Sequence, residues 1–98
     1  MRAKRKPQIE QGPPWKAIRH SGLLQMRVVR VGARRTSLRL ESEMWGALEE
    51  IAEREKIAIP ELCGHIEDTR LAGGSFTAAL RAFLISYYRA QVKDADRN

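Results

Sequence analysis

The chain has few of the residues that build disulfide frameworks, metal sites or membrane spans. Cys63 is its one cysteine, so no intramolecular disulfide can form, and no Cys/His group has zinc-site spacing. No apolar run approaches the ~18 residues that a membrane span needs, and no apolar segment follows the basic start. We therefore expect a reducing cytoplasmic setting, no metal, no cofactor and no membrane insertion.

Acidic residues are also scarce in the first part of the chain. Residues 1–39 carry eleven Lys/Arg and the single acid Glu10, whereas residues 40–98 carry seven Lys/Arg and eleven acids, within a total of +6. A basic front joined to an acidic back is typical of a protein that meets a polyanion with one side. A solubilising tail on an unrelated domain gives the same asymmetry, so charge alone leaves both readings open.

The segment from Arg34 to Glu41 alternates between apolar and polar residues. Thr36, Leu38 and Leu40 fall on one face of an extended strand, and the opposite face is basic and able to form hydrogen bonds. A lone strand leaves its backbone groups unpaired, so this one needs a partner. If the partner is the same strand of a second copy, the two form an antiparallel ribbon of the kind that fits the DNA major groove.

The sequence before this strand divides into two parts. Residues 1–22 hold a basic cluster and three prolines, a composition that predicts a flexible arm. Residues 23–31 are apolar and β-branched enough for a strand, and Gly32-Ala33-Arg34 makes a turn toward the next one. An extended arm has a similar composition, so both readings of 23–31 stand.

Three helices are predicted after the strand. The first spans about 42–55, with Glu41 and Ser42 as cap residues; the second begins near Ile59, with Pro60 in its first turn, and ends near Arg70. The third starts at a Ser75 or Thr77 cap and ends near Val92, leaving 93–98 as a tail. The fold class is mainly α with a short N-terminal strand, in one domain over residues 23–92.

Strand, helix, short break and helix in this order resemble the ribbon-helix-helix superfamily of MetJ/Arc-type repressors. Three segments look like its bacterial branch of small predicted DNA-binding proteins. They are Thr36–Glu41 with Met44–Ala52, then Gly74–Arg81, then Tyr87-Tyr88-Arg89. The resemblance covers about residues 27–90.

This resemblance implies a homodimer whose ribbon takes one strand from each subunit. The side chains it assigns to base contacts are Arg35, Ser37 and Arg39. Outside the resemblance, charge makes Lys4, Arg5 and Lys6 in the arm candidates for salt-dependent phosphate contacts or for a minor-groove contact, with a solvated tail as the alternative, and Arg34 at the turn is a further candidate phosphate contact. The expected dimer core consists of Leu38, Leu40, Trp45, Leu48, Ile51, Leu62, Ile66, Phe83 and Leu84.

In the superfamily, backbone N–H groups at the start of the second helix anchor the ribbon on phosphates. Two segments compete for that role: Ala58–Glu61, and the turn that carries Ser75 and Thr77. The ungapped spacing from Leu40 favours the first, which makes the third helix an appendage. However, Ala58 has no hydroxyl and Pro60 has no N–H donor, so both are poor phosphate ligands.

The expected function is sequence-specific binding of double-stranded DNA by a transcriptional repressor, often of its own operon. One alternative is an antitoxin-like or other adaptor that binds a protein through the third helix. Another is a module on anionic membrane surfaces, with residues 15–31 as an amphipathic helix. No acid and nucleophile stand at a catalytic spacing, so we expect no enzymatic activity.

Overall fold

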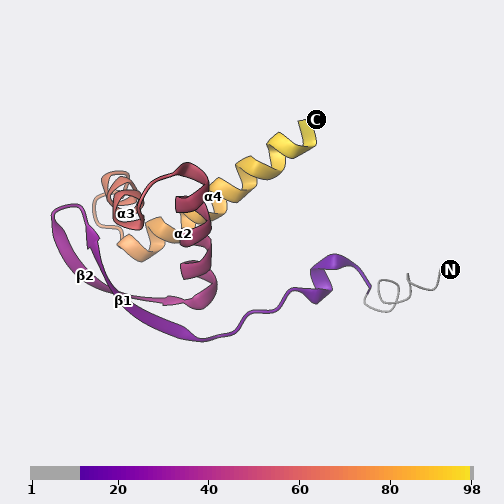
Figure 1. Cartoon of the computed structure of the whole chain (residues 1–98), viewed down its shortest axis with the longest axis horizontal. Coiled ribbons are helices and arrows are strands. Elements are labelled where there is room, and N and C mark those ends of the chain that lie inside the picture. Colours follow the sequence, from indigo (N-terminus) through magenta and orange to yellow (C-terminus); the bar gives the residue numbers. More distant parts are fainter. Residues whose placement is uncertain (1–11, 98) are drawn as a thin grey trace.

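The computed structural model describes residues 12–97. A curved hairpin lies along one side of three helices, and the C-terminal part of the last helix extends away from the others (Figure 1). The elements, in chain order, are the 3-10 turn η2 (Pro14–Ala17), the strands β1 (Leu24–Val31) and β2 (Arg34–Glu41), and the helices α2 (Ser42–Glu55), α3 (Ile59–Asp68) and α4 (Phe76–Arg97).

The ribbon forms within one chain. β2 pairs antiparallel with β1, from Val31 opposite Arg34 to Leu24 opposite Glu41. Only Gly32 and Ala33 connect the strands, and Gly32 has a φ of 64°. Glycine adopts that backbone without penalty, and a glycine at the first position of a two-residue turn suits a tight hairpin. Within one chain, β1 therefore supplies a partner strand that the sequence analysis left open, and pairing of β2 with its counterpart in a second subunit stays a prediction.

The two faces of β2 are as predicted. Leu38 and Leu40 are buried and Thr36 is partly buried, whereas Arg35, Ser37 and Arg39 are exposed. The helices cover the face that carries the two leucines, since α2 and α4 contribute to the same core. β2 is therefore half buried, with its basic side left free.

A single hydrophobic core joins the hairpin to all three helices. Every residue of the predicted dimer core except Phe83 is buried, and Phe83 packs against the cluster while partly exposed. The fully buried residue of α4 is instead Leu80, which the predicted dimer core did not include. Because these side chains are covered inside one chain, their burial does not require a second copy.

Trp45 fastens α2 to the hairpin. Its indole Nε1 donates a hydrogen bond of 2.9 Å to the carbonyl oxygen of Gln25, and the Arg27 guanidinium lies 4.5 Å from the ring centroid. Arg27 also donates to Glu49 at 2.8 Å. β1 is therefore held by a buried aromatic ring and by a cation stacked on that ring.

The start of α2 differs from the prediction. Neither Glu41 nor Ser42 makes a side-chain cap bond to the first turn. The Ser42 N–H donates instead to the carbonyl oxygen of Leu23 at 3.0 Å, which continues the strand pairing into the helix. An orphan N–H of the helix is thus satisfied by β-structure rather than by a cap.

The last two helices begin as predicted, but their ends differ from the predicted ones. α3 ends at Asp68 rather than Arg70, and α4 continues to Arg97 instead of stopping near Val92. Ser75 is the cap of α4, since its Oγ accepts the N–H of Ala78 at 3.0 Å. The expectation that this helix is an appendage is wrong, because α4 places Leu80 and Leu84 in the core.

Polar contacts also hold α4 against α2. The Tyr88 hydroxyl donates to Glu50, and the Tyr87 hydroxyl donates to Glu55 at 2.6 Å. Arg54 donates to the Gln91 side-chain oxygen at 2.6 Å. These contacts line one side of α4 and leave its opposite side open.

Two glycine substitutions should change the stability in opposite directions. Gly32→Ala forces a Cβ into a left-handed conformation and should lower the free energy of unfolding by about 1–2 kcal/mol. Gly46→Ala lies inside α2, where an added Cβ meets nothing within 4 Å, and should raise it by about 0.5–1 kcal/mol. Chemical denaturation followed by circular dichroism measures both. A Gly32→Ala chain as stable as the original would argue against the hairpin turn.

The Tyr88 hydroxyl predicts a pH dependence at high pH. Burial, together with the hydrogen bond to Glu50, raises the pKa of Tyr88 to about 12 from its usual value near 10. The folded chain therefore holds this proton more tightly, so the stabilisation is complete below pH 10 and is lost as the pH rises toward 12. The difference in unfolding free energy between the original chain and Tyr88→Phe should shrink across that interval. A difference independent of pH would contradict this linkage.

Candidate nucleic-acid interface

The strand register determines which side chains share the outer face of the hairpin, the face turned away from the helices. Residues directly opposite one another point to the same side of a sheet. The opposed pairs exposed on this outer face are Met26 with Arg39, Val28 with Ser37 and Arg30 with Arg35, whereas Glu41, opposite Leu24, lies 3.6 Å from Arg81 of α4. The predicted readers Arg35, Ser37 and Arg39 therefore lie together, and Arg30 joins them from β1.

The three arginines of the outer face hold no partner in the part of the chain that the structure describes. The side chains of Arg30, Arg35 and Arg39 are exposed and make neither a hydrogen bond nor an ion pair with the described residues. Other arginines are engaged: Arg27 binds Glu49, and Arg70 binds Glu67. The donors of the outer face are thus free for an external acceptor.

Arg30 and Arg35 stand directly opposite each other. Like charges in that position destabilise a sheet, because the two guanidinium groups repel across the strands. An anion placed between them would remove the repulsion and gain two charge-assisted hydrogen bonds. This pair is a cost to the free protein that a polyanionic partner would offset.

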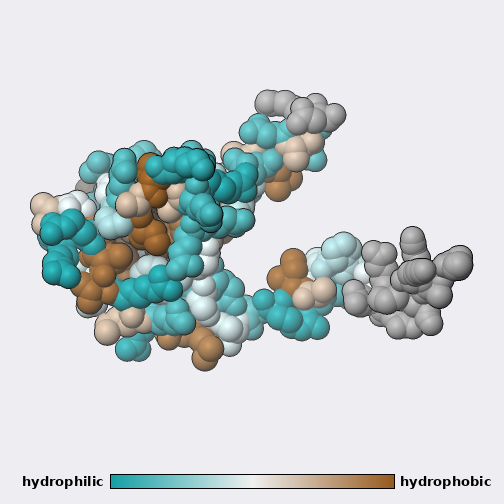
Figure 2. Space-filling model, in the orientation of Figure 1, coloured by the Kyte–Doolittle hydropathy of each residue, from teal (hydrophilic) through white to brown (hydrophobic). Residues whose placement is uncertain are grey.

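The outer face also has an apolar row, contributed by β1. Leu24, Met26 and Val28 are 53%, 60% and 56% exposed. The face is therefore mixed: the apolar row lies beside the polar residues of β2. Apolar and hydrophilic surfaces likewise alternate across the view in Figure 2. The sequence analysis did not identify Arg30 or this apolar row. A two-residue turn at Gly32-Ala33 fixes the strand register, and that register together with the alternation of side chains along β1 would have placed them on the outer face.

The predicted phosphate contacts are not gathered in one place. Arg34 pairs with Val31 in the register, so it lies on the helix side of the hairpin. The pKa of Glu67 is lowered mainly by its hydrogen bond from Arg70 and, to a smaller extent, by the charge of Arg34. Lys4, Arg5 and Lys6 lie outside the described residues. Ser75 is exposed at the start of α4, with its Oγ engaged as the cap, and Thr77 is partly buried.

Other kinds of site find little support between Gly12 and Arg97. In that range no three His, Cys, Asp or Glu side chains form a group that could hold a metal ion. The thiol of Cys63 is fully buried, and burial raises its pKa, so it stays protonated. None of the described helices is both long and apolar enough to cross a membrane.

Comparison with known families decides the classification. The sequence model of the family described as ribbon-helix-helix domain matches residues 24–88, from the first residue of β1 into the second half of α4. The chain belongs to the ribbon-helix-helix domain family. No curated protein and no solved structure gives a significant match.

Ribbon-helix-helix domains are generally DNA-binding transcription regulators without enzymatic activity, and they typically bind DNA as dimers. The match includes residues 76–88 of α4, which agrees with the place of that part of the helix in the core. Hairpin, α2, α3 and most of α4 therefore make one ribbon-helix-helix domain.

The two helix starts of this domain differ as anion sites. Ala58 caps α3 without a side-chain bond, and Pro60 and the acidic Glu61 occupy its first turn. Acidic residues are absent from the first turn of α4, which follows Ser75. Because a carboxylate repels phosphate and proline lacks an N–H, the start of α4 has the better chemistry.

The opposed arginines predict a substitution that stabilises the protein. Arg35→Thr removes the repulsion from Arg30 and introduces a residue that favours strands, so the free energy of unfolding should rise by about 0.2–1 kcal/mol. The gain should be larger at low ionic strength, where the charges are less screened.

Arg27→Thr is the matched control for this substitution, since it makes the same change on the other face of the hairpin. It removes the contacts with Trp45 and Glu49 and should destabilise the fold. Denaturant titrations at two salt concentrations compare the two variants. A loss of stability in Arg35→Thr at low salt would mean that the arginine pair is not strained.

Proposed function

We propose that this chain binds double-stranded DNA sequence-specifically by placing its β1–β2 hairpin in the major groove. The observation that carries the proposal is the outer face of the hairpin, with three unpaired arginines and Ser37 on an exposed two-stranded ribbon. A two-stranded ribbon fits the width of the major groove. The helices stay behind the ribbon, where α2 and α3 support its inner face.

Each side chain of the outer face has a role in this proposal. Arg35 and Arg39 each donate two hydrogen bonds to O6 and N7 of a guanine, and Ser37 donates or accepts at either base of a pair. Arg30 adds a third guanidinium, from the strand that the sequence pattern did not single out. Met26 and Val28 present methyl groups at the height of the thymine methyls.

Contacts with phosphates hold the ribbon in register in this proposal. Arg34 reaches the backbone from the turn end, and the arm adds Lys4, Arg5 and Lys6 as a salt-dependent attraction. Ser75 and Thr77 bind a phosphate at the start of α4. We therefore assign the phosphate to the start of α4 rather than to the start of α3, because the first turn of α3 contains Pro60 and Glu61.

The proposed output is repression of transcription, in the cytoplasm and at the nucleoid of a bacterium. A dimer seated in the groove at a promoter excludes other proteins from the same site. Autoregulation, with the operator near the chain's own gene, is the form that we expect.

A second candidate is an adaptor that binds another protein through α4. It is favoured by the exposure of Ile85 and Val92, at 61% and 59%, on a helix that extends beyond the body. The membrane-surface alternative lacks its element, since residues 15–31 do not form one helix. They hold the short η2 turn and the strand β1.

The test is selection of random duplex DNA by the full-length chain, alongside Arg39→Ala. The original chain should enrich a short motif. Arg39→Ala should bind that motif with a free energy of binding weaker by about 1–3 kcal/mol, and its preference for one base should relax at a single position of the motif. Lys56→Gly is the control, because it removes the same charge at the far end of α2, where a φ of 60° suits glycine.

Three outcomes separate the candidates. An enriched motif that depends on Arg39 and not on Lys56 supports reading by the hairpin. Binding without any motif, fading as salt rises, would reduce the role of DNA to attraction by a basic arm. No DNA binding, together with capture of a protein lost in Val92→Glu, would favour the adaptor.

A further inference from the structure

The base of the N-terminal arm is attached to the first turn of α2 through one serine. The backbone N–H of Ser21 donates to the Glu43 carboxylate, and its hydroxyl donates to the same carboxylate at 3.3 Å. The Ser21 Oγ also lies 2.9 Å from the Ser42 Oγ and accepts the N–H of Leu23 at 3.1 Å. These contacts converge on Ser21, so the chain is fixed at this point before β1 begins at Leu24.

Glu43 is the acceptor on which this attachment depends. It lies in the first turn of α2, where a carboxylate normally stabilises a helix by facing the partial positive charge of the N-terminus. Here the carboxylate also binds a residue 22 positions earlier in the chain. The pKa of Glu43 is lowered mainly by the hydrogen bond from the Ser21 backbone, so the group is ionised at neutral pH and can accept both bonds.

The segment before Ser21, residues 12–20, is exposed throughout. Its own hydrogen bonds join residues within the segment: the Arg19 guanidinium donates to the carbonyl oxygens of Lys16 and Ile18. Figure 1 shows the segment extending from the open end of the hairpin and away from the helices. The contacts of Ser21 therefore set the direction in which this segment leaves the domain.

The same segment carries positive charge and no acid. Lys16 and Arg19 are both exposed, and neither Asp nor Glu occurs between Gly12 and Ser21. The Lys16 ammonium lies 5.6 Å from the centroid of the Trp15 ring, so the two side chains are presented together. Exposed cations of this kind neutralise the phosphates of a nucleic acid.

We propose that Glu43 is a positioning residue for DNA binding: it holds the base of the arm so that Lys16 and Arg19 meet phosphates beside the groove that the hairpin occupies. This role rests on the proposed function, because it requires the hairpin to lie in the groove. The arm joins the hairpin at the end opposite the Gly32 turn. Phosphates of both DNA strands border the groove, so cations fixed at the open end of the hairpin can bind them.

Positioning and charge predict opposite effects of Glu43 on binding. A free arm loses conformational freedom when its cations bind, whereas an arm fixed at Ser21 has lost part of that freedom before it meets DNA. Removing Glu43 should therefore weaken binding if the residue positions the arm. By charge alone, Glu43 is an anion that repels DNA, and its removal should strengthen binding. The sign of the change in affinity separates the two effects.

The test is the affinity of the full-length chain for the motif enriched in the selection experiment, at one salt concentration. Glu43→Ala should weaken binding by about 3- to 10-fold, because the arm must then be ordered on the DNA. Glu53→Ala is the matched control, since it removes the same charge from an exposed position of α2 whose side chain makes neither a hydrogen bond nor an ion pair with the described residues. It should leave the affinity unchanged or raise it slightly.

Two further measurements separate positioning from a loss of folding. Glu43→Gln removes the charge but keeps an acceptor oxygen for the Ser21 N–H, so it should retain most of the affinity. In Glu43→Ala without DNA, the Ser21 amide proton should exchange faster than in the original chain. Circular dichroism should show the same helix content in all of these chains.

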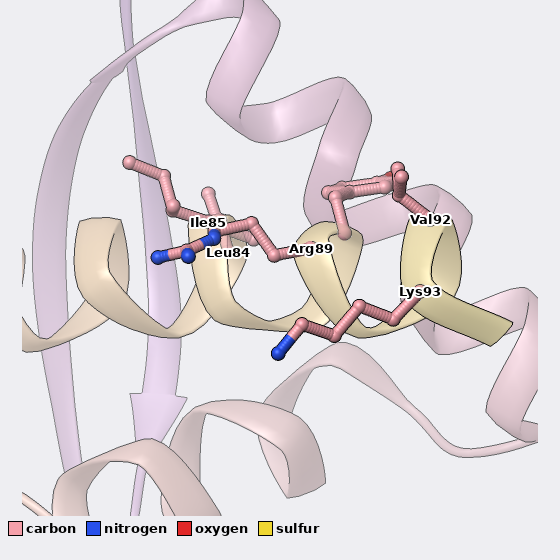
Figure 3. Close-up of a pocket in the computed structure, with 6 residues that line it drawn as sticks. Leu84, Ile85, Arg89, Val92 and Lys93 are labelled. Atoms are coloured by element: carbon pink, nitrogen blue, oxygen red, sulfur yellow. The ribbon is translucent and has the colours of Figure 1, made fainter. Parts of the chain in front are cut away.

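Lys16→Ala tests what the attachment positions. In the original chain it should weaken binding and reduce the slope of log affinity against log salt by about 1, the loss of one phosphate contact. In the Glu43→Ala background its effect should be smaller. Lys93→Ala is the control: Lys93 lies on α4 with Arg89 and Val92, beside a shallow groove of about 520 Å³ (Figure 3), and its removal should leave the slope unchanged.

A Glu43→Ala chain that binds the motif as tightly as Glu53→Ala would overturn the positioning role and leave base contacts by the hairpin intact. So would equal losses from Lys16→Ala in the two backgrounds, because they would show that the arm binds without its attachment. If the original chain enriches no motif, the proposed function fails, and the positioning role fails with it.

Discussion

Eight opposed residue pairs join β1 to β2, and the rest of the molecule is arranged around that pairing. A two-stranded ribbon is barely stable alone, so its inner face must be covered. Val31, Leu38 and Leu40 are buried on that face. The hydrogen bond from the Trp45 indole to the Gln25 carbonyl oxygen also attaches α2 to β1, because pairing with β2 alone would not hold β1 in place. Without the pairing, the helices would lose one wall of their core. The outer face would lose half of its side chains.

Charge is divided along the same line. Five arginines and one acid fall between Leu24 and Glu41, whereas the helical part is mildly acidic. Several helix carboxylates act within the fold: Glu50 and Glu55 accept from tyrosines, and Glu67 accepts from Arg70. The arginines of the outer face have no such use. The positive charge that the hairpin leaves uncompensated is therefore on the face that points away from the core.

Local patterns predicted much of this fold. The alternation of β2, the bounds of α2 and the Ser75 cap each depend on neighbouring residues, which is why they could be read from the sequence. The partner of β2 could not, because residues 23–31 suit an arm as well as a strand. Arg30 was missed for the same reason, since its position on the outer face depends on the register. Likewise, the apolar stripe of α4 does not show in the sequence whether Leu80 or Phe83 is the more deeply buried residue.

A ribbon made inside one chain is not symmetric. In a ribbon of two identical strands, both sides of the groove meet the same side chains, so the DNA beneath must read alike in both directions. Here β1 brings an apolar row and β2 brings arginines and a serine. In the proposed complex, such a hairpin would lie on DNA in one direction only. Rotating it by half a turn would put methyl groups where guanidinium groups had been, so the hairpin would select a non-palindromic sequence and fix the orientation of its chain on that sequence.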